Sequence, residues 1–194
     1  MTVLHRRTND RRHAFSIIEL LMVVALISIV TAWGLPRLDF NRYRADAAGR
    51  LARTLLQTAQ RNAITRQSDV IVSFDLATNR LRLVQDYNNN DTLNATDRVE
   101  FRALPEGAKF ATPNWVGVGG TTPSAPISGS AIRTVSSMPS IIFRRDGSSS
   151  SDAELYVTMR DRVKTEYRAV TIVASTGKTN MFKWNGSAWI AVTQ

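Results

Sequence analysis

Residues 14–35 read AFSIIELLMVVALISIVTAWGL, and the rest of the chain is interpreted from this run. From Phe15 to Leu35 it contains 21 residues, and Glu19 is the only charged one. A helix of that length is ~32 Å long, which is enough to cross the ~30 Å hydrocarbon core of a bilayer. A charge inside such a span costs on the order of 2.5–3.5 kcal/mol, so Glu19 calls for a specific partner.

The segment before this run is basic. Residues 1–14 hold four arginines and one aspartate, a net charge of +3, which predicts a cytoplasmic flank under the positive-inside rule. A removed secretory signal is the alternative, but it needs a shorter apolar core followed by a small-residue cleavage site, and this run continues to PRLD at residues 36–39. We therefore expect a single transmembrane helix over 15–36, with the remainder of the chain on the far side.

Pro36 lies at the end of this span. A proline removes one helical hydrogen bond and kinks or ends a helix. One interpretation is that the membrane helix simply ends at Pro36. Because helical periodicity resumes a few residues later, we expect a helix kink or a short interruption at Pro36 instead.

The basic leader, Ala14 and the FSIIEL segment from Phe15 to Leu20 resemble the start of the type IV pilin and type II secretion pseudopilin family. The family strongly prefers Gly where this chain has Ala14. The resemblance implies cleavage by a prepilin peptidase between Ala14 and Phe15, then N-methylation of Phe15. It also implies an assembly role for Glu19, whose carboxylate would neutralise the new terminal amine of Phe15 on a neighbouring subunit.

Residues 37–66 form the next segment, expected to be an amphipathic helix. Apolar residues recur there at three- and four-residue steps, which is one face of a helix. The face comprises Ala48, Leu51, Leu55, Ala59 and Ala63, and is widened by Leu56 and Ile64. The family resemblance implies that this helix lies on a β-sheet.

Residues 67–194 change to short segments rich in β-branched and aromatic residues, which predicts a periplasmic antiparallel β domain. We expect strands at 69–75, 80–86, 98–104, 140–146, 154–160, 168–175 and 180–192. Asp146-Gly147 and Asn185-Gly186 are typical of hairpin turns, and Trp184 and Trp189 flank the second turn. Residues 111–139, rich in Pro, Gly and Ser, are expected to form a long loop. The predicted class is α+β.

The order of these pieces resembles the minor pseudopilin H branch (GspH), which includes the FimT and FimU minor pilins. SIIFRRDG at 140–147 and VTIVASTGK at 170–178 carry this resemblance. It implies a helix followed by two small packed sheets. It further implies a minor pseudopilin of type II protein secretion, at or near the pseudopilus tip, helping to drive export across the outer membrane. The implied partners are other pseudopilins or pilins, the peptidase and an inner-membrane assembly platform.

Three alternatives remain open. The first is a minor pilin of a type IV pilus, in fibre initiation, twitching or adhesion. The second is a pilin for DNA uptake, although the corresponding carboxyl-terminal stretch offers only Lys178 and Lys183 for phosphate contacts. The third is an ordinary single-pass inner-membrane protein with a periplasmic domain and an uncut amino-terminus.

Composition argues against an enzyme. The chain has no cysteine, and both histidines, His5 and His13, lie in the leader, which removes cysteine nucleophiles, His-based acid–base catalysis and the common zinc sites. An enzyme with paired carboxylates stays open in principle, but nothing in the sequence places two acidic residues in a cleft. Of the net charge of +9, residues 36–66 carry +5 and residues 67–194 only +2. The basic charge therefore lies close to the expected membrane surface, where it can meet anionic headgroups.

Residues 86–97, DYNNNDTLNATD, have oxygen-bearing side chains at the spacing of an EF-hand calcium loop. The candidate ligands are Asp86, Asn88, Asn90, Thr92 through its carbonyl, Asn94 and Asp97, with Leu93 at the apolar eighth place. Asp91 replaces the usual turn Gly, Asp97 replaces the usual Glu, and no helices flank the loop. The alternative is a polar connection between the strands at 80–86 and 98–104, because Asn and Asp favour turns. No other cofactor is expected.

Overall fold

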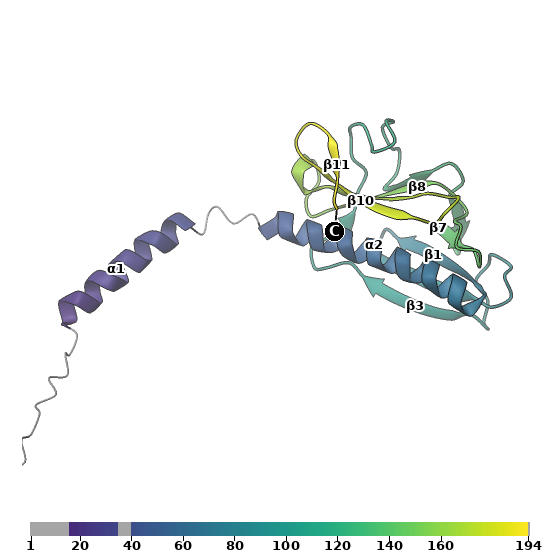
Figure 1. Cartoon of the computed structure of the whole chain (residues 1–194), viewed down its shortest axis with the longest axis horizontal. Helices are drawn as coiled ribbons and strands as arrows, with labels where there is room; N and C mark the ends of the chain where they lie inside the picture. Colours follow the sequence, from purple (N-terminus) through teal and green to yellow (C-terminus); the bar gives the residue numbers. More distant parts are fainter. Residues whose placement is uncertain (1–15, 35–39, 194) are drawn as a thin grey trace, which may run out of the picture. The chain divides into compact units, whose positions relative to one another are not determined.

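The computed structural model describes residues 16–34 and 40–193, with the side chains of 33 and 34 excepted. The chain divides into two units, Met1–Asp39 and Phe40–Gln194. Figure 1 shows the described part of the first as a helix and that of the second as a head of a helix and strands. Three predicted features, the cleavage at Ala14, the methylation of Phe15 and the kink at Pro36, lie outside the described residues.

The described element of the first unit is α1 (Ile17–Gly34). It begins after Ser16, whose carbonyl accepts hydrogen bonds from the backbone N–H groups of Glu19 and Leu20 at 3.0 and 3.1 Å. Side chains 16–32 are all exposed; Ile17 is 82% exposed and Val30 70%. Among the residues with a described structure, no helix meets the length and apolarity needed to cross a membrane. The predicted span, residues 15–36, begins before and ends after the described residues 16–34.

The described part of the second unit consists of one long helix and short strands. The helix is α2 (Phe40–Arg66). The strands that follow are β1 (Asp69–Asp75), β2 (Arg80–Asp86), β3 (Arg98–Ala103), β4 (Lys109–Phe110), β5 (Ile127–Gly129), β6 (Arg133–Val135), β7 (Met138–Phe143), β8 (Ala153–Thr158), β9 (Arg168–Ile172), β10 (Thr179–Trp184) and β11 (Trp189–Ala191), with a 3₁₀ turn at Lys164–Glu166 before β9.

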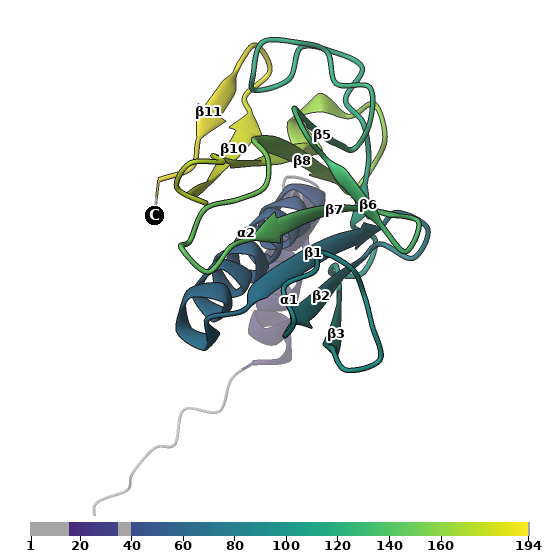
Figure 2. The ribbon, with the colours of Figure 1, turned by 90° about the vertical axis from the view of Figure 1, so that its right-hand side faces the viewer.

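The strands form two antiparallel sheets, seen on either side of α2 in Figure 2. Sheet A has the order β3-β2-β1-β7-β6, and sheet B the order β11-β10-β9-β8-β4, with β5 also paired to β8. Every strand alternates its side chains between two faces, so each sheet can turn one face toward α2. The predicted α+β class, with a helix against two antiparallel sheets, is confirmed.

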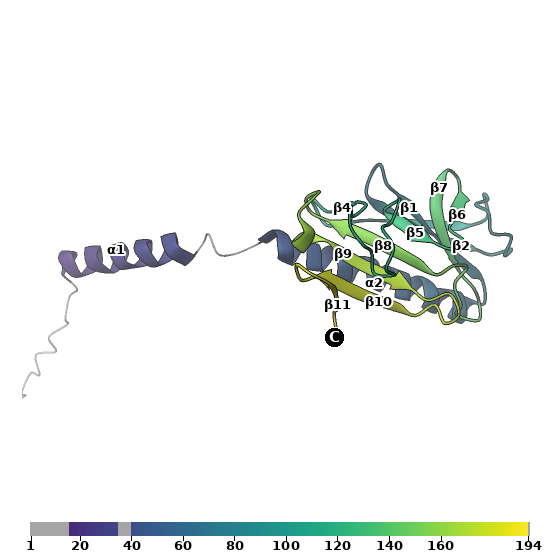
Figure 3. The same cartoon turned by 90° about the horizontal axis from the view of Figure 1, so that it is seen from above.

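The core lies where α2 meets both sheets. The helix contacts β1 of sheet A and β8, β9 and β10 of sheet B, and Figure 3 shows it running along them. Its buried face consists almost entirely of small residues: Ala45, Ala48, Gly49, Ala52, Leu56, Ala59 and Ala63. At Gly49 an added Cβ would lie only 2.7 Å from Met181 Cε and 3.0 Å from Arg168 Cβ. The small side chains thus allow the helix to approach the sheets closely.

The buried face of α2 overlaps the predicted one. Ala48, Leu56, Ala59 and Ala63 are fully buried, as expected. Leu51 and Leu55 are only half-buried, and Ile64 is 44% exposed. The centre of the face consists of small residues, and these larger side chains lie at its flanks.

Two expectations for the head need correction. Residues 111–139 do not form one long loop, because β5, β6 and the start of β7 lie within them. The Asp146-Gly147 turn forms, with the Gly147 N–H donating to the Arg144 carbonyl at 2.9 Å, but β7 and β8 around it belong to different sheets. The chain there crosses from sheet A to sheet B.

The turn at Asn185-Gly186 agrees with the sequence. It joins β10 to β11, so that the predicted strand at 180–192 is a hairpin. Trp184 and Trp189 are directly opposite in its register, and their ring centroids lie 5.4 Å apart in an edge-to-face arrangement. The hairpin is therefore held by an aromatic cross-strand pair.

The other face of sheet A carries a second, smaller apolar cluster. It comprises Ile71, Val84, Val135 and Ile142, and Leu93 packs against it. Leu93 belongs to the connection between β2 and β3. This connection is therefore a cover for part of the sheet as well as a link between two strands.

The position of the α2 face can be tested with a pair of substitutions in the unit Phe40–Gln194. Leu56→Ala should lower the free energy of unfolding by about 2–5 kcal/mol, because it opens a cavity in the core. Ile64→Ala removes an exposed side chain and should change it by less than ~1 kcal/mol. Urea denaturation measures both values. Equal losses would contradict the observed orientation of the helix.

Candidate functional site

The described residues contain two candidate functional sites, and the first is the amino-terminal helix. Glu19 lies in the first turn of α1, where a negative charge interacts favourably with the helix dipole. Ser16-Ile17-Ile18-Glu19 also has the spacing of a capping box. No hydrogen bond or ion pair joins the Glu19 carboxylate to another of the described residues. The Glu19 carboxylate therefore stabilises the start of α1, and none of the described residues neutralises its charge.

The second region is the connection between β2 and β3, residues 87–97, together with Asp86 at the end of β2. We refer to residues 86–97 as the Asn-rich loop. Asp86 is fully buried. Its Oδ2 accepts the backbone N–H of Asp91 at 2.8 Å. Its Oδ1 is buried and has no hydrogen-bond partner among the described residues.

The amide side chains of the loop converge. Asn94 Nδ2 lies 3.4 Å from the Oδ1 atoms of both Asn88 and Asn90, while Asn94 Oδ1 is buried without a partner in the described part of the chain. Asn90 Oδ1 also accepts the backbone N–H of Thr92 at 3.0 Å. Three of the predicted oxygen-bearing residues thus share one small region.

Asp97 closes the loop onto its start. Its Oδ1 accepts the backbone N–H of Tyr87 at 3.4 Å, and its Oδ2 accepts that of Asn94 at 2.9 Å. Asp97, the last candidate ligand, therefore lies next to Tyr87, which directly follows Asp86, the first candidate ligand. The structure brings the two ends of the predicted set together.

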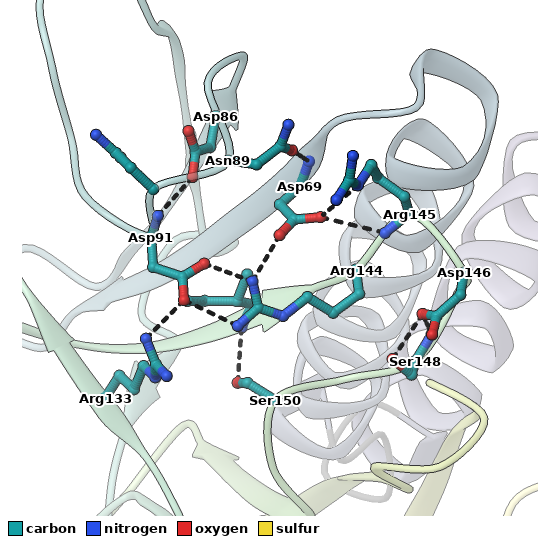
Figure 4. Close-up of polar contacts among 12 residues, drawn as sticks. Asp69, Asp86, Asn89, Asp91, Arg133, Arg144, Arg145, Asp146, Ser148 and Ser150 are labelled. Atoms are coloured by element: carbon teal, nitrogen blue, oxygen red, sulfur yellow. Dashed lines mark hydrogen bonds and ion pairs between the residues drawn. The ribbon is translucent and has the colours of Figure 1, made fainter.

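An ion-pair cluster fixes the loop to sheet A (Figure 4). Arg144, just after β7, holds both Asp91 oxygens, with Nη1–Oδ1 at 2.6 Å and Nη2–Oδ2 at 2.8 Å. Arg144 Nη1 also lies 2.6 Å from Asp69 Oδ2, and Arg133 Nη1 lies 2.6 Å from Asp91 Oδ2. Asn89 Oδ1 adds a contact by accepting the Asp69 backbone N–H at 2.8 Å.

These contacts determine the charge state of the cluster. The hydrogen bonds from Arg144 lower the pKa of the Asp91 carboxyl, against the opposing effect of its partial burial. The hydrogen bonds to Asp91 raise the pKa of the Arg144 guanidinium. Both groups are therefore charged at neutral pH, and the Asp91 carboxylate is directed at the arginines of sheet A.

The sequence identified the loop but missed this cluster. Arg144 lies in the SIIFRRDG segment used for the family resemblance, with no role assigned to it. It is 53 residues from Asp91 in the chain, so no local spacing could reveal the contact. The pairing of β1 with β7 brings the two together, with Val70 opposite Phe143.

The loop differs from common metal centres in its ligand types. Within the described ranges, no group of three or more His, Cys, Asp or Glu side chains is arranged to hold a metal ion. The oxygens of the Asn-rich loop come largely from asparagine amides. Such neutral oxygens, with a small number of carboxylates, suit hard cations that take oxygen ligands.

The cluster can be tested by a double-mutant cycle in the unit Phe40–Gln194, with a chelator present to exclude metals. Arg144→Met leaves Asp69, whose side chain is 4% exposed, without its closest cation. We expect a loss of about 2–3 kcal/mol in the free energy of unfolding. Asp91→Asn should show a coupling to it of about 1–2 kcal/mol.

Arg102→Met is the matched control for this cycle, because Arg102 pairs with Glu100 while both side chains remain largely exposed, at 57% and 44%. Its cost should stay below ~1 kcal/mol. If Arg144→Met is no more costly than Arg102→Met, the cluster does not hold the loop.

Comparisons with known proteins address the first region. Residues 9–35 match the family described as the prokaryotic N-terminal methylation motif. No curated protein matches this chain.

Two solved structures of the minor pseudopilin EpsH from the type II secretion system of Vibrio cholerae are similar to it. One has a TM-score of 0.48 and 15% identity, covering 72% of this chain and 97% of the other. The second has a TM-score of 0.46 and 16% identity, covering 76% and 99%. Both identities are too low to transfer an activity. The predicted resemblance to the type IV pilin and pseudopilin family is confirmed through the methylation motif that residues 9–35 carry.

Proposed function

We propose that this chain is a structural subunit of a pilus-like fibre, of the minor pseudopilin type, and that it performs no catalysis. The observation that carries the proposal is the methylation motif at 9–35, joined to a helix whose described side chains are all exposed. A helix that is apolar all round needs an apolar environment. Lipid can supply that environment before assembly, and the helices of neighbouring subunits can supply it afterwards.

The proposed sequence of events begins at the inner membrane. The arginines of the leader keep the amino-terminus in the cytoplasm, α1 lies in the bilayer, and the Phe40–Gln194 unit is periplasmic. Prepilin peptidase then cuts between Ala14 and Phe15, and Phe15 is methylated. An inner-membrane platform finally moves the subunit into the fibre beside other pseudopilins or pilins.

In this scheme Glu19 sets the register between the helices of neighbouring subunits. In an apolar environment its carboxylate requires a positive partner, and the new amine of Phe15 on a neighbouring subunit has the opposite charge. At 4 Å and an effective dielectric of ~20, such a pair is worth about 4 kcal/mol before desolvation. A subunit out of register leaves both charges unpaired, which is costly. Correct stacking of the helices is thereby favoured.

The finer proposal is a place at or near the tip of a type II secretion pseudopilus, where the subunit helps drive proteins across the outer membrane. The motif supports a fibre subunit, and the head of two sheets against a helix agrees with the expectation for the pseudopilin H branch. A minor pilin of a type IV pilus would use the same chemistry. Neighbouring genes for a secretin and a secretion ATPase would favour the pseudopilus of type II secretion.

Glu19→Gln separates the assembly role from a role in starting the helix. Glutamine fills the same place in a capping box, so α1 should form and the protein should still enter the membrane. The charge is lost, however, and we expect incorporation into fibres to fall about tenfold or more, measured by cross-linking to neighbouring subunits. Ser28→Ala, in the same helix, is the control and should assemble normally. Normal assembly of Glu19→Gln would rule out the pairing.

Processing gives a second test. Mass spectrometry of the native protein should find an amino-terminus at Phe15 carrying one additional methyl group. Ala14→Leu should block the cut, because a large side chain replaces a small one at the cleavage position, and the leader should stay attached. A native protein that begins before Phe15 would favour the single-pass anchored protein instead.

A further inference from the structure

We propose that the Asn-rich loop, residues 86–97, binds a calcium ion. The ligands are side-chain oxygens of Asp86, Asn88, Asn90, Asn94 and Asp97 and the carbonyl oxygen of Thr92. These are the first, third, fifth, ninth, twelfth and seventh places of an EF-hand loop. The site is independent of the amino-terminal motif and of the fibre function.

The main observation is the unpartnered oxygen of Asp86. A carboxylate that is removed from water has to be paired or coordinated, since its burial is otherwise costly. Asp86 is fully buried, its Oδ2 is used by the Asp91 N–H, and its Oδ1 has no partner within the described residues. A cation in the loop would satisfy this oxygen.

Asp91, at the sixth place, adopts the backbone that a calcium loop requires. EF-hand loops have glycine there because the chain turns sharply. Asp91 has φ +62°, in the left-handed region that aspartate tolerates better than most residues. Its N–H points back to Asp86, and its carboxylate leaves the loop to bind Arg144 and Arg133. The missing glycine is therefore no obstacle.

The charge balance also suits a divalent cation. Asp86 and Asp97 supply two negative charges within the ligand set. The nearby positive charges of Arg144 and Arg133 are engaged by Asp91, and Arg144 is also engaged by Asp69. Asp86 Oδ1 is therefore the carboxylate oxygen without a partner among the described residues. Asp97 would bind the ion through oxygens that also accept the backbone N–H groups of Tyr87 and Asn94.

The ligand types favour calcium over magnesium. Calcium accepts six to eight oxygens, including amides and carbonyls, in a flexible geometry, whereas magnesium demands a near-octahedral set and keeps several waters. The loop offers three amide side chains and a carbonyl. Strands β2 and β3 replace the helices that flank an EF-hand, so the ion would order a loop and not move helices.

Binding would act on the fold through Leu93. This residue, at the eighth place, packs on the second apolar cluster of Ile71, Val84, Val135 and Ile142. An ion that fixes the loop therefore also fixes the cover of sheet A. We expect calcium to raise the melting temperature of the head.

The test uses the full chain in detergent, freed of metal with a chelator and titrated with calcium chloride by isothermal calorimetry. We expect one site per chain, with magnesium chloride binding more weakly. Asp86→Asn keeps the acceptor for the Asp91 N–H but removes the charge, and should weaken calcium binding about tenfold or more. Asn88→Ala, at an exposed position, should weaken it without disturbing the fold.

Asp75→Asn is the matched control. Asp75 is another aspartate in a polar turn, where its Oδ1 accepts the Ala77 N–H at 3.0 Å, and its substitution should leave calcium affinity unchanged. The proposal is overturned if the native chain binds no calcium at millimolar concentration, or if Asp86→Asn and Asn88→Ala bind as tightly as the native chain. An equal loss in Asp75→Asn would also overturn it. Glu19→Gln should bind calcium normally, because Glu19 is not a calcium ligand. Calcium binding and fibre assembly can therefore be tested independently of each other.

Discussion

The close approach of α2 to two sheets is the constraint on which the head depends. A helix can enter the space between sheet A and sheet B only if its buried face is small, and that face is a row of alanines with one glycine. Gly49 lies against Met181 and the Arg168 side chain. The approach also places Arg168, 3% exposed, 2.6 Å from Asp46 on the helix. Arg168 is buried while Asp46 is 33% exposed, and the pair connects α2 to β9 at a defined place.

The two helices of the chain differ in how their apolar surface is satisfied. The buried face of α2 is covered by strands of its own unit. The described side chains of α1 are largely apolar and all exposed. A surface of that kind signifies interaction with lipid or protein. This contrast is the physical basis for assigning recognition to α1 and folding to the head.

The sequence predicted the elements better than the contacts between distant elements. The amino-terminal motif, the long helix and the Trp184–Trp189 hairpin are local patterns, and each was correctly recognised. The face of α2 was predicted in part, because Ala48, Ala59 and Ala63 are buried as expected, whereas Leu51 and Ile64 lie at the flanks of the buried face. The short strands at 127–129 and 133–135 lacked periodicity and form only because β8 and β7 supply partners. Arg144 was missed for the same reason, since its contact depends on strand pairing.

The two proposed sites follow from one electrostatic argument. A carboxylate in an apolar or buried environment is costly unless an opposite charge reaches it. Asp91 meets this requirement inside the chain, through Arg144 and Arg133. Glu19 and Asp86 Oδ1 do not meet it within the described residues. The unpartnered oxygen of Asp86 is the basis of the proposed calcium site. The place of Glu19 on an exposed, largely apolar helix is the basis of the proposed pairing with a charged terminus of another subunit.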